Sequence, residues 1–373
     1  MLSLLYNNIM LLFFIIITIK LNSNYFKLNT YLFNSCLFYH GCLTLAYILI
    51  FTGSGKAADY YTYLHLVIPP QDHYSFISSN FIYQIVKLFK NLFLNDFNII
   101  VIFSLISFFG IIIFVQNLIK LGIERKIAYT IFFIPGLHFW TTILGKDCLI
   151  LFFLSYFFHL YIDRKIFFSI ILLMLVFLIR YHIGLVFLLS VVITEIIIMK
   201  GYRKFILLLI SLIIFYIFFN LPYIQNLMYN SSNILSQNII LQTLNELSEY
   251  AQKYTYSDTH YESSNLYVNM FNYVIFPLEF ILKNNSLVVN SYILIEIFTL
   301  IFLSILILNH KKDFKIDKRI IYFLFICTFI YLMIMPQTFF NFGLNTRQKW
   351  MIIPFIIYLS FLLKNLFVRI KKM

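Results

Sequence analysis

The stretch IFFSIILLMLVFLIRYHIGLVFLLSVVITEIIIM, residues 166–199, decides the fold class of this chain. Two apolar runs are joined there by Arg180-Tyr181-His182. Apolar runs of this kind recur from end to end, and roughly 17 to 20 such residues are enough for an α-helix to cross a bilayer. An ionisable side chain at the join is costly in a membrane, so Arg180 is by default a candidate functional residue.

The composition extends this interpretation to the whole chain. Apolar residues make up 61% of it and charged residues only 12%, against about 25% charged in soluble domains. The runs lack the period-two alternation of barrel strands. We therefore predict an all-α, polytopic integral membrane protein, with residues 1–373 forming a single transmembrane domain. The eleven predicted spans are residues 2–19, 33–51, 97–119, 127–140, 148–162, 166–181, 183–199, 205–221, 290–309, 320–336 and 350–366.

The distribution of basic residues predicts the orientation. Of the 28 Lys and Arg residues, 19 fall in loops on one side of the predicted spans, and such loops are cytoplasmic. The amino terminus is then periplasmic and the carboxyl terminus cytoplasmic. The net charge of +13 is explained by this bias and by contact with anionic membrane lipids, so no nucleic-acid partner is expected. The four cysteines lie in or beside apolar runs without a CxxC pair, which argues against disulfides and bound zinc.

Two predicted periplasmic segments are long. The first, residues 52–96, contains apolar positions at helical spacing in residues 76–94 with lysines opposite, a pattern typical of a helix lying in the membrane interface. The second, residues 222–289, contains an amphipathic pattern in residues 234–254. Residues 257–265 form its predicted loop tip, and this Tyr- and Asn-rich segment suits either carbohydrate contacts or an interfacial lid.

Basic residues at the outer ends of the spans are the first candidates for a binding site. Arg180 and Arg347 both lie at such ends, with Lys349 close to Arg347. Arginine stays charged and binds phosphate oxygens with two parallel hydrogen bonds, so the pair suits a diphosphate. Arg347 and Lys349 are equally well explained as residues that extend to the membrane edge.

The candidates for a catalytic base are His182, Asp59 and Asp147, in that order. Each is predicted on the outer side, where it can reach an acceptor hydroxyl. Asp147 has a structural alternative, since it falls in the first turn of a predicted helix beside Lys146, where a carboxylate is favoured. Asp59 is also explained as a solvated loop residue. Glu195, inside a span, is expected to pair with a neighbouring polar group.

Four motifs together resemble the Wzy-type and EpsG-like polysaccharide polymerases of bacterial surface glycans. They are ADYYTY at residues 58–63, PGLHFWTTILGKD at residues 135–147, RYHIG at residues 180–184, and Asn345-Thr346-Arg347 before Pro354. The resemblance covers nearly the whole chain. It departs from the family pattern at Tyr181, where we expect proline.

The resemblance implies a GT-C-like glycosyltransferase of the bacterial inner membrane that needs neither metal nor cofactor. Its substrate would be an undecaprenyl diphosphate-linked oligosaccharide, polymerised at the periplasmic face into O-antigen or capsule, and its partners include a chain-length regulator protein. Arg180 and Arg347 match the family's arginines in the external loops, and Lys146 and Lys349 add positive charge for the diphosphate.

Two other classes remain open. A flippase or other transporter of lipid-linked oligosaccharides also needs cations for a diphosphate, but it typically carries internal repeats. A transferase that adds one sugar or acyl group to a lipid-linked glycan has nearly the same sequence features.

The predicted orientation is tested by reporter fusions. Fusions after Lys315 and after Lys371 are expected to report a cytoplasmic location, because basic loops are retained inside. A fusion near His260 is expected to report the periplasm. A cytoplasmic signal at His260 would reverse the assignment of every candidate site residue.

Overall fold

The computed structural model describes residues 2–21, 29–52, 59–66, 79–199, 287–309, 317–338 and 351–364. Within these ranges the chain is all-helical and forms no strand. Three segments are long and apolar enough to cross a membrane: Thr30–Leu49, Asp96–Lys120 and Tyr181–Ile198. Ile166–Ile179 and Met351–Lys364 are shorter apolar helices. The all-α fold class is therefore confirmed in the described part, while the number of spans stays a prediction.

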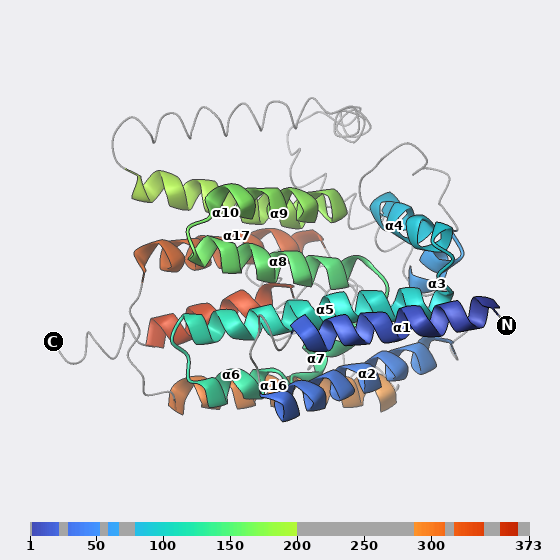
Figure 1. Ribbon diagram of the computed structural model, residues 1–373. Coiled ribbons are helices and arrows are strands. Elements are labelled where there is room, and N and C mark those ends of the chain that lie inside the picture. Colours follow the sequence, from blue (N-terminus) through green and yellow to red (C-terminus); the bar gives the residue numbers. More distant parts are fainter. Residues whose placement is uncertain are drawn as a thin grey trace. The chain divides into compact units, whose positions relative to one another are not determined.

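The chain forms two compact units. Unit 1 comprises Met1–Leu185, Phe298–Lys315 and Ser360–Met373, and unit 2 comprises Val186–Ile297 and Ile316–Leu359. Long helices of unit 1 run alongside one another (Figure 1). Its helices from the first part of the chain are α1 (Leu2–Leu21), α2 (Thr30–Thr52), α3 (Asp59–Leu64), α4 (Ser79–Asn91), α5 (Asp96–Lys120), α6 (Arg125–Ile131), α7 (Pro135–Phe139), α8 (Lys146–Ile162) and α9 (Ile166–Ile179).

Helix α5 is the centre of unit 1, because α1, α2, α6, α7 and α8 all contact it. Its start is set by Asn95, whose side chain accepts a hydrogen bond from the backbone N–H of Asn98 at 2.8 Å, as an N-cap residue does. Its end is followed by Gly122 at a φ of 94°, a backbone conformation that glycine adopts without strain. Local sequence signals thus fix both ends of the central helix.

A glycine lets α5 and α8 approach closely. A Cβ atom placed on Gly110 would lie 2.9 Å from the backbone N and Cα atoms of Phe152, closer than packed atoms tolerate. Small residues allow such contacts between apolar helices, whose attraction in a membrane comes from packing. Helix α8 in turn packs against α9, so α5, α8 and α9 form a continuous packed series within unit 1.

The predicted span at residues 127–140 is not one continuous helix. Helix α6 ends at Ile131 and α7 begins at Pro135. Proline has no backbone N–H and its ring clashes with the preceding helical turn, so it starts a helix well and does not continue one. The apolar pattern predicted one continuous span, and this prediction is wrong because Pro135 starts a new helix.

The other predicted spans that fall on described residues coincide with helices. They include α10 (Tyr181–Ile198), α16 (Leu287–Asn309), α17 (Lys318–Thr338) and the helix Met351–Lys364. The predicted helix at residues 76–94 is present as α4, whereas its position in a membrane interface stays a prediction. The span at residues 205–221, the amphipathic pattern at 234–254 and the loop tip at 257–265 lie outside the described residues.

Unit 2 contains a buried ion pair and an aromatic cluster. Glu195 of α10 binds the Arg319 guanidinium of α17, which confirms that Glu195 pairs with a polar neighbour. Phe187 packs edge-on against Phe355 with ring centroids 4.8 Å apart. Because the Glu195–Arg319 ion pair is buried, loss of either charge would leave the other one uncompensated.

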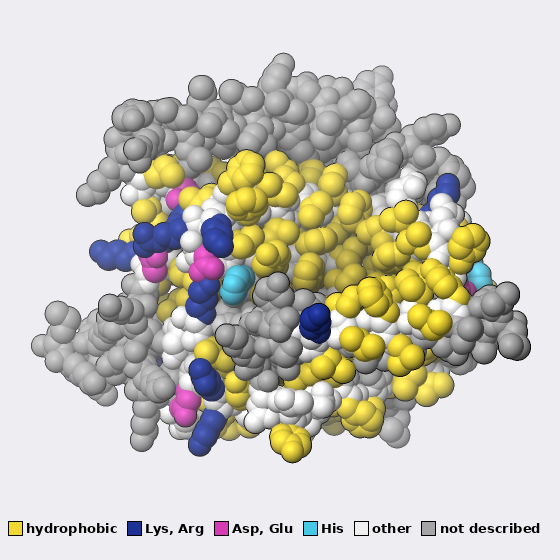
Figure 2. Space-filling view, viewed as in Figure 1, with side chains coloured by type: hydrophobic (Ala, Val, Ile, Leu, Met, Phe, Trp, Pro, Cys, Tyr) yellow, Lys and Arg dark blue, Asp and Glu magenta, His cyan; other side chains and the backbone are white. Residues whose placement is uncertain are grey.

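Hydrophobic side chains are exposed on helices of unit 1. Phe38 of α2 is 75% exposed and Phe167 of α9 is 71% exposed. Figure 2 shows hydrophobic side chains covering much of the described surface in view, and most of the Lys and Arg side chains in view lie on its left. Large apolar patches are rare on soluble monomers, so these side chains are compatible with contact to lipid.

The tight contact between α5 and α8 gives a stability prediction. Gly110→Ala is expected to lower the free energy of unfolding by about 1–3 kcal/mol, because the new methyl group overlaps the Phe152 backbone. Gly41→Ala in α2 is the control, since nothing lies within 4 Å of its added Cβ. Thermal unfolding in detergent checks both, and equal stability of the two variants would contradict the packing at Gly110.

Candidate functional site

Arg180 is held at a sharp join between two helices. It follows the last residue of α9 in an extended conformation, with φ −142° and ψ 95°. Its backbone N–H donates to the carbonyl of Val176 at 2.8 Å, and its carbonyl accepts from Gly184 at 3.0 Å. A Cβ on Gly184 would lie 2.5 Å from the Cα atom of Phe177. Glycine at position 184 therefore permits the tight join that positions the Arg180 side chain.

Asp147 meets Arg180 at this join. It lies in the first turn of α8, where a carboxylate is favoured by the helix dipole. Its Oδ1 atom is 2.7 Å from the terminal nitrogen Nη2 of Arg180. The two side chains are only 12% and 10% exposed. The contact is a buried ion pair between the start of α8 and the end of α9.

Burial decides what this pair contributes. Removing one partner of a buried pair typically costs about 3–5 kcal/mol, because the other charge is left uncompensated. The guanidinium carries five N–H donors. Among the described residues, the one ion pair of Arg180 is that with Asp147. The carboxylate thus fixes the direction of the guanidinium, and the guanidinium has the donor capacity to bind a further oxygen.

Lys146 and His182 lie next to the ion pair. Lys146 is the first residue of α8, and His182 lies in the first turn of α10. The His182 ring stands edge-on to that of Tyr181, with centroids 5.2 Å apart. The positive charges of Arg180 and Lys146 both act on the His182 ring. Four of the seven predicted site residues therefore come together, with two cations against one carboxylate.

The remaining three candidates are not placed at this site. Asp59 is the first residue of α3, and its side chain is not described. Arg347 and Lys349 lie outside the described residues. Helix α3 packs against α4, and α4 packs against α9. The segment that was predicted to be periplasmic is thus connected through α4 to α9, the helix that Arg180 follows.

The ion pair and the predicted cytoplasmic loops lie at opposite ends of α8. Asp147 is in its first turn and Asp163 follows its last residue, which separates them by about 24 Å at 1.5 Å per residue. At that far end Lys120 binds Asp163. This is the separation expected if the Lys-rich loops and the candidate site face opposite sides of a membrane.

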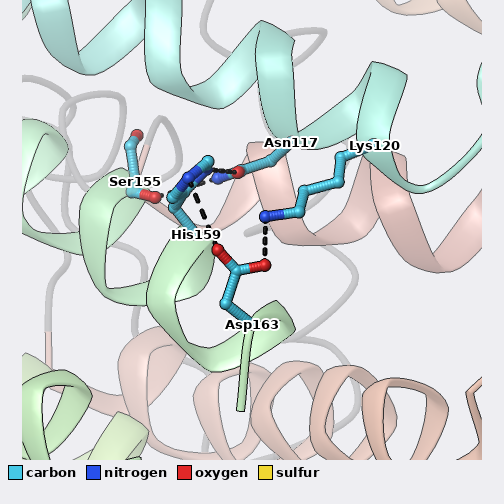
Figure 3. A network of polar contacts seen from close by, with 5 residues as sticks. All are labelled: Asn117, Lys120, Ser155, His159 and Asp163. Atoms are coloured by element: carbon cyan, nitrogen blue, oxygen red, sulfur yellow. Dashed lines mark hydrogen bonds and ion pairs between the residues drawn. The ribbon is translucent and has the colours of Figure 1, made fainter. Parts of the chain in front are cut away.

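The cluster at the far end joins α5 to α8 (Figure 3). Asn117 donates to the backbone carbonyl of Ser155 at 2.9 Å, and Nδ1 of His159 is 2.7 Å from the side-chain oxygen of Asn117. Lys120 and Asp163 are each about one third exposed. Partly exposed ion pairs contribute about 0–1 kcal/mol to stability. This cluster is therefore best explained as a structural contact between the ends of α5 and α8.

Sequence reasoning missed a pair of buried histidines. His40 of α2 and His138 of α7 face each other, with their Nδ1 atoms 2.7 Å apart. His138 lies inside the motif at residues 135–147, but the sequence alone predicts no partner or function for it. The available signal was the presence of two histidines in apolar stretches, where polar side chains need partners.

Within the described ranges, no group of three or more His, Cys, Asp or Glu side chains is arranged to hold a metal ion. Among the described residues at this join, the two cations Arg180 and Lys146 outnumber the one carboxylate of Asp147, and such a balance of charge suits an anion. Comparison of the chain with protein-family models, with curated proteins and with solved structures finds no match.

Proposed function

We propose that this protein polymerises undecaprenyl diphosphate-linked oligosaccharide repeat units into a surface polysaccharide, O-antigen or capsule. The reaction takes place at the periplasmic face of the bacterial inner membrane, within a polytopic, GT-C-like enzyme. The observation that carries the proposal is the buried Asp147–Arg180 ion pair with Lys146 and His182 beside it. The resemblance of the four sequence motifs to Wzy-type polymerases supports the same assignment.

Arg180 holds the diphosphate of the donor. In the reaction, the bond between the anomeric carbon of the growing chain and the diphosphate oxygen breaks, and the diphosphate leaves with added negative charge. A cation fixed in a partly dry site stabilises that charge without reorganising during the reaction. Asp147 of α8 keeps the Arg180 guanidinium in place through the 2.7 Å contact. The orientation of this planar group is therefore set before the substrate binds.

Lys146, Arg347 and Lys349 supply the rest of the positive charge. Lys146 lies at the start of α8, near the ion pair. Arg347 and Lys349 are assigned from the sequence motif, which places them at the outer end of the last predicted span. A diphosphate carries charge on two phosphoryl groups, so more than one cation is required to bind both.

His182 takes the proton of the acceptor hydroxyl as that oxygen attacks the anomeric carbon. A general base must lie within hydrogen-bond reach of the hydroxyl, and His182 lies beside the proposed diphosphate site. Asp59 is the second candidate. Asp147 is the third, because its carboxylate is already engaged by the Arg180 guanidinium. The mechanism needs neither metal nor cofactor.

One observation favours a second function, that of a transporter for lipid-linked oligosaccharides. Broken helices are frequent at the substrate sites of transporters, and the predicted span at residues 127–140 is broken between α6 and α7. The cations grouped around Arg180 near one end of α8 favour the polymerase, since a translocation path needs polar groups along its length.

A deletion strain separates the two functions. Gel analysis of surface polysaccharide is expected to show single-repeat glycan without long chains, because export continues while polymerisation stops. Loss of every repeat from the surface would instead support the transporter. Complementation with Arg180→Lys is expected to restore less than about 1% of long-chain polymer, since lysine keeps the charge but lacks the planar fork for phosphate.

Arg125→Lys is the matched control for Arg180→Lys. Arg125 is exposed at the start of α6, so its replacement is expected to restore polymer fully. Both variants are compared at equal membrane protein levels by immunoblot. Wild-type polymer in the Arg180→Lys strain would reduce Arg180 to a structural residue at a helix join.

The base assignment is tested with purified enzyme and lipid-linked repeat units. His182→Ala is expected to slow turnover by roughly 10²–10⁴-fold, while the donor still binds because Arg180 and Lys146 remain. Asp59→Asn and Asp147→Asn are measured beside it. Near-normal turnover of His182→Ala with an inactive Asp59→Asn would move the base to Asp59, and full activity of all three variants would exclude the general-base mechanism.

A further inference from the structure

The connection between α7 and α8 leads directly into Lys146 and Asp147 of the candidate site. It spans residues 140–145, none of which is helical. Its first five residues, from Trp140 to Leu144, are all buried, with exposed fractions of 8% or less. Loops normally run over the surface of a protein. A buried connection of this kind therefore needs polar contacts that hold it in place.

Thr141 attaches this connection to the central helix of unit 1. The buried hydroxyl of Ser107 on α5 donates to the hydroxyl oxygen of Thr141 at 2.8 Å. Thr141 donates in turn to the backbone carbonyl of Leu137, in the last turn of α7, at 2.6 Å. Such a carbonyl has no partner within its own helix. The two hydrogen bonds therefore complete the end of α7 and fix the following residues against α5.

The first turn of α8 depends on the residues that precede it. Gly145 is its N-cap residue, and no side-chain hydrogen bond caps the helix there. Helix ends fray, and the close contact between α8 and α5 lies further along α8, at Phe152. The place of Asp147 is therefore set from two sides, by the packing of α8 and by the connection that Thr141 holds.

The place of Asp147 matters because its contact with Arg180 tolerates little displacement. The carboxylate oxygen and the guanidinium nitrogen are 2.7 Å apart, and both side chains are largely buried. A buried ion pair is favourable only when its geometry is good. A displaced Asp147 would also release the guanidinium from the direction in which it meets a substrate.

His138 is a second anchor of the same part of the chain, but it holds α7 itself. Its ring contacts His40 of α2 and the backbone carbonyl of Phe132. Thr141 comes after α7, six residues before Asp147. It is bonded to α5, the helix on which α8 also packs. Thr141 therefore holds the connection in the same frame as α8.

We propose that Ser107 and Thr141 are positioning residues for the candidate site. Their hydroxyl contact holds the connection between α7 and α8 against α5, and it thereby places Asp147 to direct the Arg180 guanidinium. Both residues act through Asp147. The expected effect on turnover rests on the proposed function, whereas the structural coupling between Thr141 and Asp147 does not.

Helix α5 carries a matched control contact close to Ser107. Ser104 and Thr44 of α2 are joined hydroxyl to hydroxyl at 3.0 Å, and both residues are buried. This contact attaches α2 to α5. Its loss removes a hydrogen bond of the same kind without releasing the connection that precedes Asp147.

Double-mutant cycles on the unfolding of the full-length protein in detergent test the coupling without an assay of activity. Thr141→Val is combined with Asp147→Asn, and Thr44→Val with Asp147→Asn is the control cycle. We expect non-additive effects in the first cycle, because the contact of Asp147 is already weakened when Thr141 is replaced, and additive effects in the control. Ser107→Ala removes the same contact from α5 and gives a second cycle if Thr141→Val does not fold. Additive effects in the test cycle, or equal coupling in test and control, would overturn the positioning role.

Turnover of lipid-linked repeat units by the purified variants places the effect in the reaction. Thr141→Val is expected to lower kcat by roughly 10- to 100-fold with a smaller change in KM, because misplacing a catalytic group by about 1 Å can cost about 10²-fold. Thr141→Ser keeps the hydroxyl and is expected to retain wild-type kcat. Ser107→Ala combined with Thr141→Val should lose no more than Thr141→Val alone, since both changes remove one contact.

Equal kcat values for Thr141→Val and Thr44→Val would exclude a positioning role in the reaction. An inactive wild-type protein would contradict the proposed function alone, and the unfolding cycles would still decide whether Thr141 positions Asp147.

Discussion

The buried contact between Asp147 and Arg180 is the interaction on which the candidate site depends. It joins the start of α8 to the end of α9 with the two charged groups 2.7 Å apart. Neither charge is tolerated alone at that depth, since an uncompensated buried ion costs several kcal/mol. The pair therefore fixes the register between the two helices, and it also fixes the direction in which the guanidinium presents its remaining donors.

Close helix packing makes that contact possible. Gly110 lets α8 lie directly against α5, and Gly184 lets the first turn of α10 lie against Phe177 of α9. Apolar helices in a membrane gain little from the hydrophobic effect between them, so backbone proximity and buried polar contacts supply the specificity. The same logic applies in unit 2, where the Glu195–Arg319 pair joins α10 to α17.

In its described part, unit 1 contains polar contacts of three different kinds. The ion pair with Lys146 lies at the start of α8, the histidine pair lies between α2 and α7, and the Lys120–Asp163 contact lies beyond the end of α8. Only the first combines burial with an excess of positive charge, which is why the proposed anion chemistry is placed there. The second is a buried contact between two histidine rings, and the third is a partly exposed ion pair between helix ends.

The sequence by itself determined the helical class and the membrane-compatible character, and it marked Arg180 as a candidate, because apolar run length and an isolated charge are local properties. It also placed Lys146, Asp147 and His182 among the candidates. Only the tertiary structure decided that Asp147 pairs with Arg180, that residues 127–140 break into α6 and α7, and that His40 meets His138. The physical reason is that such pairings depend on which faces of distant helices pack together, and an apolar pattern repeated on every helix carries too little information to select them.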